Sequence, residues 1–309
     1  MPVLATVDRS DAVVVSAVIV TWNARDEVLA CLRSLETCPP SVAWEAIVVD
    51  NGSRDGTPGA LRREAPWARV IVNSTNRGLA AANNQGMIAA RGDCFLISNP
   101  DVVWRPGAVD ALRSVLERQP RAAWVTPRLR YVDGRLQTSA GDLPKLLDAL
   151  IGRQGERARR RRAANPTTGL WWDEWEHDEE RRIGRGHEAA YLVTRRAVEE
   201  VGLQDERYRL DWEGIEWTAR LRAAGWEVWF SPDAEAIHLG GTSIRQVPYR
   251  WIVSSHRGMY RYFAGRTALA FRPVLAMIVS ARAALKVVAA AAGAGMYERA
   301  FRGDDNPLK

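Results

Sequence analysis

The chain has 309 residues, and 47% of them are hydrophobic, which is enough apolar material for one large or two modest folded domains. Its three cysteines have neither the number nor the spacing of a disulfide scaffold or a metal cluster, so a reducing cytoplasm is the expected compartment. The net charge is +6, yet residues 244–309 alone hold eleven Lys or Arg against three acidic residues, and no nucleic-acid-binding motif occurs. An anionic partner, such as membrane lipid or a diphosphate, is therefore expected, unless the basic end is only a solvated face.

The first 130 residues alternate short β-branched runs with helical patterns, and this alternation defines the expected fold. Strands are predicted at residues 13–20, 45–49, 69–72 and 94–97, and helices at 26–36, 58–64 and 79–90. The order predicts an α/β fold with a Rossmann-like, mainly parallel sheet flanked by helices. Ligands of such sheets lie at the carboxyl ends of the strands, and the unusual loops that start at Asp50, Asn76 and Ser98 all fall there.

The second half of the chain is irregular from about residue 132 onward. A basic run at residues 157–162 precedes a tryptophan-rich, acidic run at residues 170–178, and together they predict a long surface excursion that is either functional or disordered. Regular patterns then return, with strands at 189–193 and 227–230 and helices at 195–201 and 213–224.

A basic segment with helical patterns ends the chain. One pattern begins at Pro248, and residues 274–293 form a second run that is apolar for about the length of a membrane span. Arg282 and Lys286 interrupt this run on one side of the helix, and burying each charge in a bilayer costs about 2.5–3.5 kcal/mol. We therefore expect residues 246–309 to be an amphipathic helical extension that lies on a membrane surface or packs on the core, rather than a spanning helix.

Three loops carry residues suited to ligand binding. Asp50 follows a strand and can accept hydrogen bonds from a base or a ribose, although the segment is also a good turn and helix cap. Asn76 and Gly78 precede a helix of small residues whose amino end favours phosphate, although small residues also serve tight packing. Asp101 follows the fourth strand, and a carboxylate placed there suits Mg²⁺ or Mn²⁺ beside a diphosphate, unless it is only a turn residue.

Taken in order, these loops resemble those of the family 2 glycosyltransferases of the GT-A fold, in particular their bacterial rhamnosyltransferase-like branch. The resemblance rests on Val-Ile-Val-Thr-Trp-Asn at 18–23, Val-Asp-Asn-Gly-Ser at 49–53 with Asp-Gly-Thr at 55–57, Asn-Arg-Gly at 76–78, Asn-Pro-Asp at 99–101, and Arg-Leu at 220–221 with Ala-Gly-Trp at 224–226. It covers roughly residues 13–245. It implies a GT-A domain at 1–245, with a donor-binding half at about 13–130 and an acceptor and catalytic half at about 131–245.

The resemblance implies a nucleotide-sugar donor and a divalent metal ion, Mg²⁺ or Mn²⁺. It implies that Asp50 recognises the nucleotide base, and that Asp101 is the last residue of a metal-binding DxD motif whose first position is Asn99. His238 stands where the family often has a histidine near the donor diphosphate, where it would bind metal or phosphate; a lone histidine is otherwise structural. The donor site that the resemblance implies consists of Thr21, Asn23, Asp50, Asn76, Gly78, Asn83, Asn99 and Asp101.

The catalytic base is the point at which this sequence departs from the family. The family places a Glu-Asp pair at the start of a helix shortly before a Gly-Trp, and here the pair falls on Glu213 and Gly214, so the usual base has no side chain. Glu213 is the best replacement and Asp211 the second, because a carboxylate in this stretch can deprotonate the acceptor hydroxyl. The alternative is that these acids only cap the helix and complement its dipole.

Candidates for the acceptor side come from the irregular half of the chain. Trp171, Trp172 and Trp175 could stack on an acceptor sugar, or they could anchor the loop through hydrophobic contacts. His187 begins the segment 187–190, which stands where the family often has a Gly-Ala that lines the sugar site. This departure leaves the preference for the donor sugar open.

The expected activity is therefore that of a metal-dependent, inverting glycosyltransferase. The acceptor hydroxyl attacks the anomeric carbon in line with the departing nucleoside diphosphate; the branch resemblance implies dTDP-L-rhamnose as donor and a lipid-linked or other cell-envelope saccharide as acceptor. The expected location is the cytoplasm, peripheral at the inner face of the plasma membrane, and nucleic acid is not expected as a partner. A non-catalytic nucleotide-sugar or glycan-binding protein of the same fold stays open as an alternative. A nucleotidyltransferase is disfavoured, because the Gly-rich loop expected after its first strand is absent.

Overall fold

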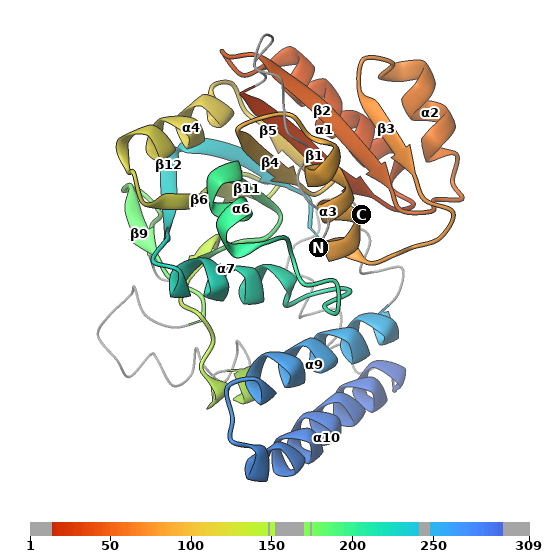
Figure 1. Ribbon diagram of the computed structural model, residues 1–309. Helices are drawn as coiled ribbons and strands as arrows, with labels where there is room; N and C mark the ends of the chain where they lie inside the picture. Colours follow the sequence, from red (N-terminus) through yellow and green to blue (C-terminus); the bar gives the residue numbers. More distant parts are fainter. Residues whose placement is uncertain (1–13, 148, 152–169, 174, 241–247, 293–309) are drawn as a thin grey trace.

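One ten-stranded sheet organises the computed structural model of the chain, which describes residues 14–147, 149–151, 170–173, 175–240 and 248–292. Its first half consists of four parallel strands in the order β3, β2, β1, β4 (Figure 1). These strands are β1 (Val15–Thr21), β2 (Trp44–Asp50), β3 (Arg69–Val72) and β4 (Cys94–Ser98). All four were predicted from the sequence. β1, β2 and β4 are mostly buried, and strands covered on both faces need the continuous apolar runs that mark them, whereas β3 is a partly exposed edge strand.

The second half of the sheet is mixed. β11 (Ala190–Thr194) lies antiparallel between β4 and β6 (Ala122–Arg130), and β12 (Glu227–His238) runs parallel to β6. The remaining short strands are β5 (Val102–Trp104), β7 (Leu136–Gln137) and β9 (Arg181–Ile183), which pair antiparallel with β12 or β6, and β8 (Ala140–Gly141) with β10 (Arg185–Gly186), which form a second sheet. The predicted α/β architecture is confirmed. The sequence prediction did not include β5 and β6, and it ended β12 at residue 230 rather than at His238.

Helices cover both faces of the sheet. They are α1 (Arg25–Thr37), α2 (Thr57–Glu64), α3 (Leu79–Ala89), α4 (Ala108–Arg118), α6 (Arg195–Val201) and α7 (Glu213–Ala223). Alternate residues of β1 enter two separate cores: Val15 and Ile19 pack with α1, whereas Val18 and Val20 pack in the core that includes residues of α3 and α7. The approach of α3 to β1 is close, because a Cβ on Gly86 would lie 2.2 Å from the Cγ1 atom of Val18.

Two helices form the carboxyl-terminal part of the described chain. α9 (Pro248–Ala264) and α10 (Arg272–Ala291) lie side by side below the main body in Figure 1, joined by the short 3-10 helix η2 (Leu269–Phe271). A third apolar cluster holds this pair against the start of α7, with Trp212 and Ile215 packed against Phe263 and Leu275. The domain boundary predicted near residue 245 falls outside the described residues, so it stays a prediction.

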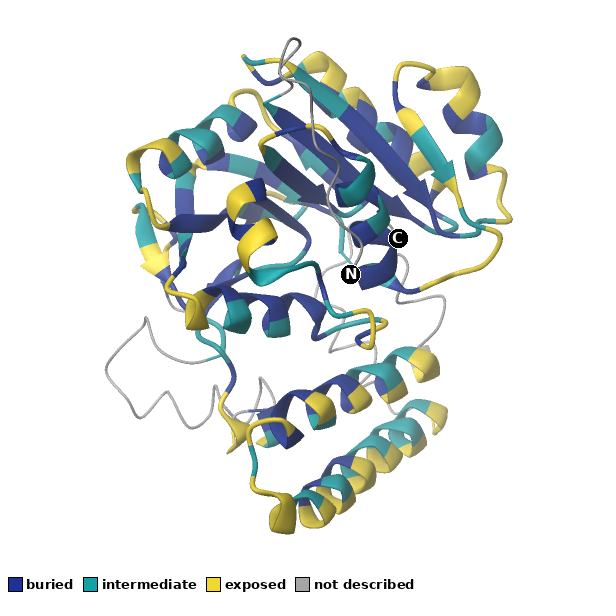
Figure 2. Ribbon diagram, viewed as in Figure 1, coloured by how far each residue is buried: buried dark blue, intermediate teal, exposed yellow. Residues whose placement is uncertain are grey.

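α10 has one inner face and one exposed apolar face. Leu275 and Val279 are buried, and Arg282 points the same way, donating hydrogen bonds to the backbone oxygen of Leu150 and to Nε2 of His256 at 2.8 Å each. The exposed side carries aliphatic residues at helical spacing, which are Val274, Met277, Ile278, Leu285 and Val288, and Figure 2 shows much of this helix as exposed. Leu269–Ala291 is also long and apolar enough to cross a membrane. The two charges that interrupt the apolar run therefore lie toward the protein, while the apolar residues face outward.

The tryptophan-rich run is only partly a surface feature. Trp172 and Trp175 are buried in the core beside β12, and the ring of Trp175 packs against Phe230 with 4.9 Å between centroids. The prediction of a surface excursion is therefore wrong for these two residues, because the indole rings fill a gap under the sheet that the sequence pattern did not reveal. The basic run at residues 157–162 lies outside the described residues.

Candidate active site

A cavity of about 1520 Å³ opens at the carboxyl edge of the parallel strands. One wall comes from the loops that follow β1, β2, β3 and β4, and the opposite wall comes from α9 and α10. Of the predicted donor residues, those that line the cavity are Asn76, Gly78, Asn99 and Asp101. The expectation that the unusual loops meet at one edge is confirmed by this arrangement.

Asp50 and Thr21 are buried at the same edge, at the ends of β2 and β1. Oδ1 of Asp50 accepts hydrogen bonds from the backbone N–H groups of Gly52 and Ser53, at 3.2 and 3.0 Å. Oδ2 of Asp50 and Oγ1 of Thr21 have no hydrogen-bond partner among the described residues. Buried polar atoms are rarely left unpaired, so both oxygens can pair with polar groups of a ligand at this edge. Neither residue lines the open cavity directly.

Asn51 joins the loop after β2 to the loop after β3 at the carboxyl edge of the parallel strands, which we call the donor edge. The sequence analysis did not select this residue. Its Oδ1 accepts from the backbone N–H of Arg77 at 2.9 Å, and its Nδ2 donates to Oδ1 of Asn76 at 3.2 Å and to the carbonyl oxygen of Gly78 at 3.3 Å. Gly78 has a φ of 93°, and a Cβ there would lie 2.9 Å from the carbonyl oxygen of Arg209. That carbonyl accepts the first N–H of α3, from Leu79 at 2.9 Å, so a protein group already occupies part of the helix end that was expected to favour phosphate.

Two other predicted donor residues have local partners. Asn23, with a φ of 47°, accepts a hydrogen bond from the backbone of Arg54 at 2.8 Å and holds the loop after β1 against the loop after β2. Asn83 does not line the cavity, and its amide donates to Oε1 of Gln204 at 3.1 Å in a buried contact. Asn83 therefore links α3 to the loop before α7, and its contact with the donor stays a prediction.

Asp101 and His238 lie next to each other at one edge of the sheet, because Asp101 directly precedes β5 and Val102 of β5 pairs with His238 of β12. Oδ1 of Asp101 lies 3.4 Å from Nε2 of His238, and both side chains are nearly buried. Nδ1 of His238 lies 3.0 Å from Oε1 of Gln137, an acceptor that orients the imidazole ring. Nε2 forms no hydrogen bond in the described chain. A carboxylate oxygen and an oriented imidazole nitrogen form a donor pair that suits Mn²⁺ or Mg²⁺.

No group of three or more His, Cys, Asp or Glu suited to a metal ion occurs within the described residues. The pair Asp101 and His238 would therefore hold an ion only together with ligand oxygens and water, which is how Mg²⁺ is usually bound beside phosphates. Asn99, at the first position of the DxD-like motif, lines the cavity next to this pair.

Three carboxylates gather at the start of α7. Glu213 is buried, and its Oε2 has no hydrogen-bond partner among the described residues. Asp211 accepts hydrogen bonds from the backbone of Trp212 at 3.0 Å and from Oγ of Ser255 at 2.6 Å. Glu188, which sequence reasoning missed, adjoins both. Burial and the neighbouring carboxylates raise the pKa of Glu213 well above its usual value, burial raises the pKa of Asp211, and burial followed by the charge of Asp211 raises the pKa of Glu188 to about 7.

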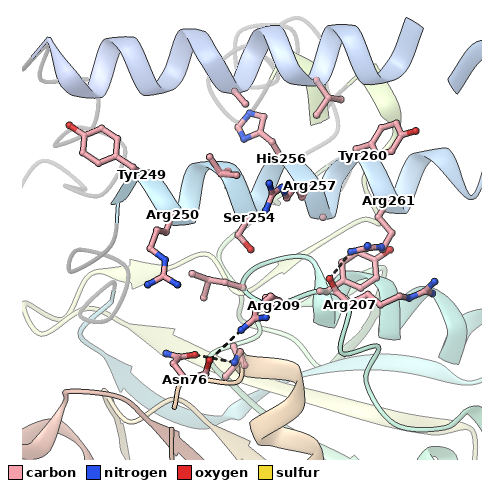
Figure 3. Close-up of a pocket in the computed structure, with 18 of the residues that line it drawn as sticks. Asn76, Arg207, Arg209, Tyr249, Arg250, Ser254, His256, Arg257, Tyr260 and Arg261 are labelled. Carbon is pink, nitrogen blue, oxygen red and sulfur yellow. Dashed lines mark hydrogen bonds between the residues drawn. The ribbon is translucent and has the colours of Figure 1, made fainter. Parts of the chain in front are cut away.

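The wall opposite the donor edge is strongly cationic. Six arginines line the cavity against one carboxylate, that of Asp101, and they are Arg207, Arg209, Arg250, Arg257, Arg261 and Arg272. Figure 3 shows Arg250 and Ser254 projecting from α9 toward the loop with Asn76, to which Arg209 donates a hydrogen bond. Arg250, Arg257 and Arg261 recur at the spacing of one helical face, a signal in the sequence that could have identified this wall.

The predicted acceptor residues divide into two groups. Trp172 and Trp175 are core residues, so they are not available to stack on a sugar. Trp171 is partly exposed, and the guanidinium of Arg185 lies 3.8 Å from its ring centroid. The ring of His187 lies 5.5 Å from Trp171 and 5.4 Å from His238. His187 is therefore placed beside His238 of the candidate metal pair.

Comparisons with known proteins identify the family of the chain. The family model described as "Glycosyl transferase family 2" matches residues 16–174. The N-acetylglucosaminyl-diphospho-decaprenol L-rhamnosyltransferase of Mycobacterium tuberculosis is 32% identical over 272 residues, which cover 82% of this chain and 85% of that protein.

Two solved structures share the fold. The mannosyltransferase PcManGT from Pyrobaculum calidifontis, in complex with GDP-Man and Mn²⁺, superposes with a TM-score of 0.54 at 19% identity, over 94% of this chain and 78% of that chain. S. aureus TarS 1-349 superposes with a TM-score of 0.50 at 13% identity, over 81% of this chain and 70% of that chain. At these identities the two structures support the fold and no finer property.

Proposed function

The chain belongs to glycosyl transferase family 2, in its rhamnosyltransferase-like branch, and from this premise we propose that it transfers a sugar from a nucleotide-sugar donor to a lipid-linked saccharide diphosphate. One observation carries the proposal: a single cavity joins the donor-edge residues Asn76, Asn99 and Asp101 to an arginine-lined wall on α9. A donor and an acceptor that each carry a diphosphate would place four phosphates in this cavity, and six guanidinium groups complement that charge.

The proposed donor is dTDP-L-rhamnose, and its supporting fact is the L-rhamnosyltransferase of Mycobacterium tuberculosis at 32% identity. The same relative acts on an N-acetylglucosaminyl diphosphate carried by decaprenol, so we propose the same class of acceptor. The free Oδ2 of Asp50 and Oγ1 of Thr21 would pair with the nucleoside of the donor.

The proposed reaction is a single displacement with inversion at the anomeric carbon. A carboxylate of the cluster at the start of α7, which includes the predicted bases Glu213 and Asp211, takes the proton of the acceptor hydroxyl. Asp101 and His238 would hold a divalent ion that neutralises charge on the departing nucleoside diphosphate. Gln137 keeps the His238 ring in the required orientation.

We also propose that the protein works at the surface of a bilayer, with the exposed face of α10 on the lipid. Ile278 and Leu285 are among five large aliphatic residues exposed on that face, whereas Arg282 is turned toward α9. A face of this kind, with the exposed Arg266 shortly before it in the chain, suits an interfacial helix on anionic lipid. Residues 246–309 would then be a membrane-facing extension of a domain at 1–245, on the cytoplasmic side.

The direct test is transfer by the purified full-length protein. A panel of nucleotide sugars is combined with a lipid-linked N-acetylglucosaminyl diphosphate and Mn²⁺, and products are read by mass spectrometry and their anomeric configuration by NMR. We expect rhamnosylated product of inverted configuration with dTDP-L-rhamnose. Donor binding without any release of nucleoside diphosphate would instead support the non-catalytic alternative that Gly214 raises.

The membrane proposal has its own measurement. Flotation with vesicles that contain an anionic phospholipid should carry the wild-type protein, and Ile278→Glu combined with Leu285→Glu should abolish this binding while leaving the fold intact, since both side chains are exposed. Equal flotation of the double variant would refute the proposal.

A further inference from the structure

The side chain missing at Gly214 leaves a space in the carboxylate cluster, and Glu188 fills it. A Cβ built on Gly214 would lie 2.5 Å from both Cγ and Cδ of Glu188, and 3.0 Å from its Oε1. Carbon atoms in contact are about 3.5–4.0 Å apart, so the Glu188 carboxylate and a side chain at position 214 cannot occupy this space together. The glutamate thus places a carboxylate where the side chain of residue 214 would begin.

We propose that Glu188 is the general base of the transfer reaction, in place of the side chain that Gly214 lacks. The inference rests on the proposed glycosyltransferase function and assigns one step of it. The Glu188 carboxylate accepts the proton of the acceptor hydroxyl as that oxygen forms a bond to the anomeric carbon. The bond between that carbon and the diphosphate oxygen breaks, and its electron pair leaves with the nucleoside diphosphate.

The sheet places Glu188 beside the donor edge. Ala190 pairs with Ser98, and the backbone N–H of Asn99 donates to the carbonyl oxygen of Ala189 at 2.7 Å. Residue 188 therefore lies alongside the segment 99–101, whose residues line the cavity. Glu188 is half-buried beside this segment and is not itself among the residues that line the cavity.

The other two carboxylates of the cluster are less available. Glu213 has only 2% of its surface exposed, so an acceptor would reach it only after α7 moved. Asp211 has one oxygen on the backbone of Trp212 and the other on Ser255, and it has a φ of 72°, which fixes the start of the helix. These contacts indicate that Asp211 orients α7, while Glu213 and Asp211 together act on Glu188 through their charge.

The electrostatic surroundings of Glu188 suit a base that works near neutral pH. Burial, and then the charge of Asp211, raise its pKa, whereas Arg185 and the backbone N–H groups of Gly214 and Ile215 lower it, and the balance is about 7. Glu213 is coupled to the same group from α7. A base is most effective when its pKa lies near the working pH.

The test compares kcat and donor affinity in a small set of variants of the full-length protein. Glu188→Gln keeps the size of the side chain and removes the base, so we expect kcat to fall by about 100-fold or more, with the donor dissociation constant unchanged by calorimetry. Glu199→Gln, on α6 away from the cluster, is the matched control and should keep full activity. The rise of kcat with pH around 7 should also disappear in Glu188→Gln.

A second pair of variants separates a base from a structural role. Glu188→Ala should lose kcat, and adding Gly214→Asp to it should restore about tenfold or more, since the new carboxylate enters the vacated space. Equal kcat in Glu188→Gln and the wild type, or loss confined to Glu213→Gln or Asp211→Asn, would overturn the assignment of Glu188 alone. Absence of transfer by the wild-type protein with every donor and acceptor would overturn the proposed function, and this inference with it.

Discussion

Arg250 and Arg257 offer the sharpest test of how the acceptor is recognised. They lie seven residues apart on α9, or about 10 Å along the helix axis, and both line the cavity with exposed side chains. Neither guanidinium forms a hydrogen bond or ion pair with another side chain of the described residues, so replacing either arginine breaks no such contact among them. The perturbation is therefore Arg250→Ala and Arg257→Ala, singly and together.

The expected effect follows from the charge of a diphosphate. A hydrogen bond to a charged group contributes about 1.5–3 kcal/mol, and exposure to solvent reduces this toward the lower limit. At about 1.4 kcal/mol for each guanidinium, each single variant should raise the acceptor KM about tenfold, and the double variant about 100-fold if the two contacts are independent. The donor KM and the kcat at saturation should stay within about twofold, because the two arginines are expected to contribute only to binding of the acceptor.

The assay measures initial transfer rates over a range of acceptor concentrations at two salt concentrations. Added salt should weaken acceptor binding in the wild type more than in the double variant, because the variant has fewer charges to screen. Arg62→Ala, an exposed arginine on α2 that does not line the cavity, is the control and should change nothing. An unchanged acceptor KM, or a rise in the donor KM instead, would show that these arginines do not bind the acceptor diphosphate.

Three further predictions concern metal binding, pH and packing. Gln137→Ala should weaken Mn²⁺ binding, measured by calorimetry in the presence of nucleoside diphosphate, by about 10–100-fold, because His238 loses the acceptor that orients it; equal affinity would refute this. Burial lowers the pKa of His256 from 6.5 to about 4. Between these two pH values the unfolded chain binds a proton at this histidine and the folded chain does not, so the folded state loses stability as the pH falls. Between pH 7.5 and pH 5 the free energy of unfolding should fall by about 2 kcal/mol because of this group. Denaturation at the two pH values should show a loss smaller by this amount in His256→Gln than in the wild type, and an identical loss in both proteins would contradict the prediction. Gly86→Ala should lower the free energy of unfolding by about 1–3 kcal/mol through overpacking against β1, whereas Gly59→Ala, where only the end of an arginine side chain is near, should be neutral or stabilising.

The donor half was predictable because its signals are local. The strands from β1 to β4 have continuous apolar runs, and the loops with Asp50, Asn76 and Asp101 follow them directly in the sequence. The parallel arrangement of the strands then brings their carboxyl ends to one edge without further information. Of the eight residues expected at the donor site, four line the cavity, which are Asn76, Gly78, Asn99 and Asp101, and four do not, which are Thr21, Asn23, Asp50 and Asn83. A helix position such as that of Asn83 does not by itself reveal which side faces a ligand.

The acceptor half was harder to predict, because its structure depends on contacts between segments that are distant in the sequence. Trp172 and Trp175 have the composition of a surface loop but lie in the core, since burial is decided by where β12 and the loop meet. The aliphatic face of α10 is exposed because Arg282 pairs with His256 on α9, a contact that helical periodicity alone does not predict.

Sequence alone determined the α/β class, the family resemblance, the donor edge and the absence of a side chain at Gly214. Only the tertiary structure decided what takes the place of that side chain. Glu188 is far from Gly214 in the chain and reaches it because β11 runs antiparallel beside β4 and its first residue, Ala190, follows closely after a segment that packs against the start of α7. A space the size of one side chain in a packed protein can be filled by any residue that the fold brings next to it, whatever its position in the chain. The position of the carboxylate was therefore set by strand pairing rather than by the local motif.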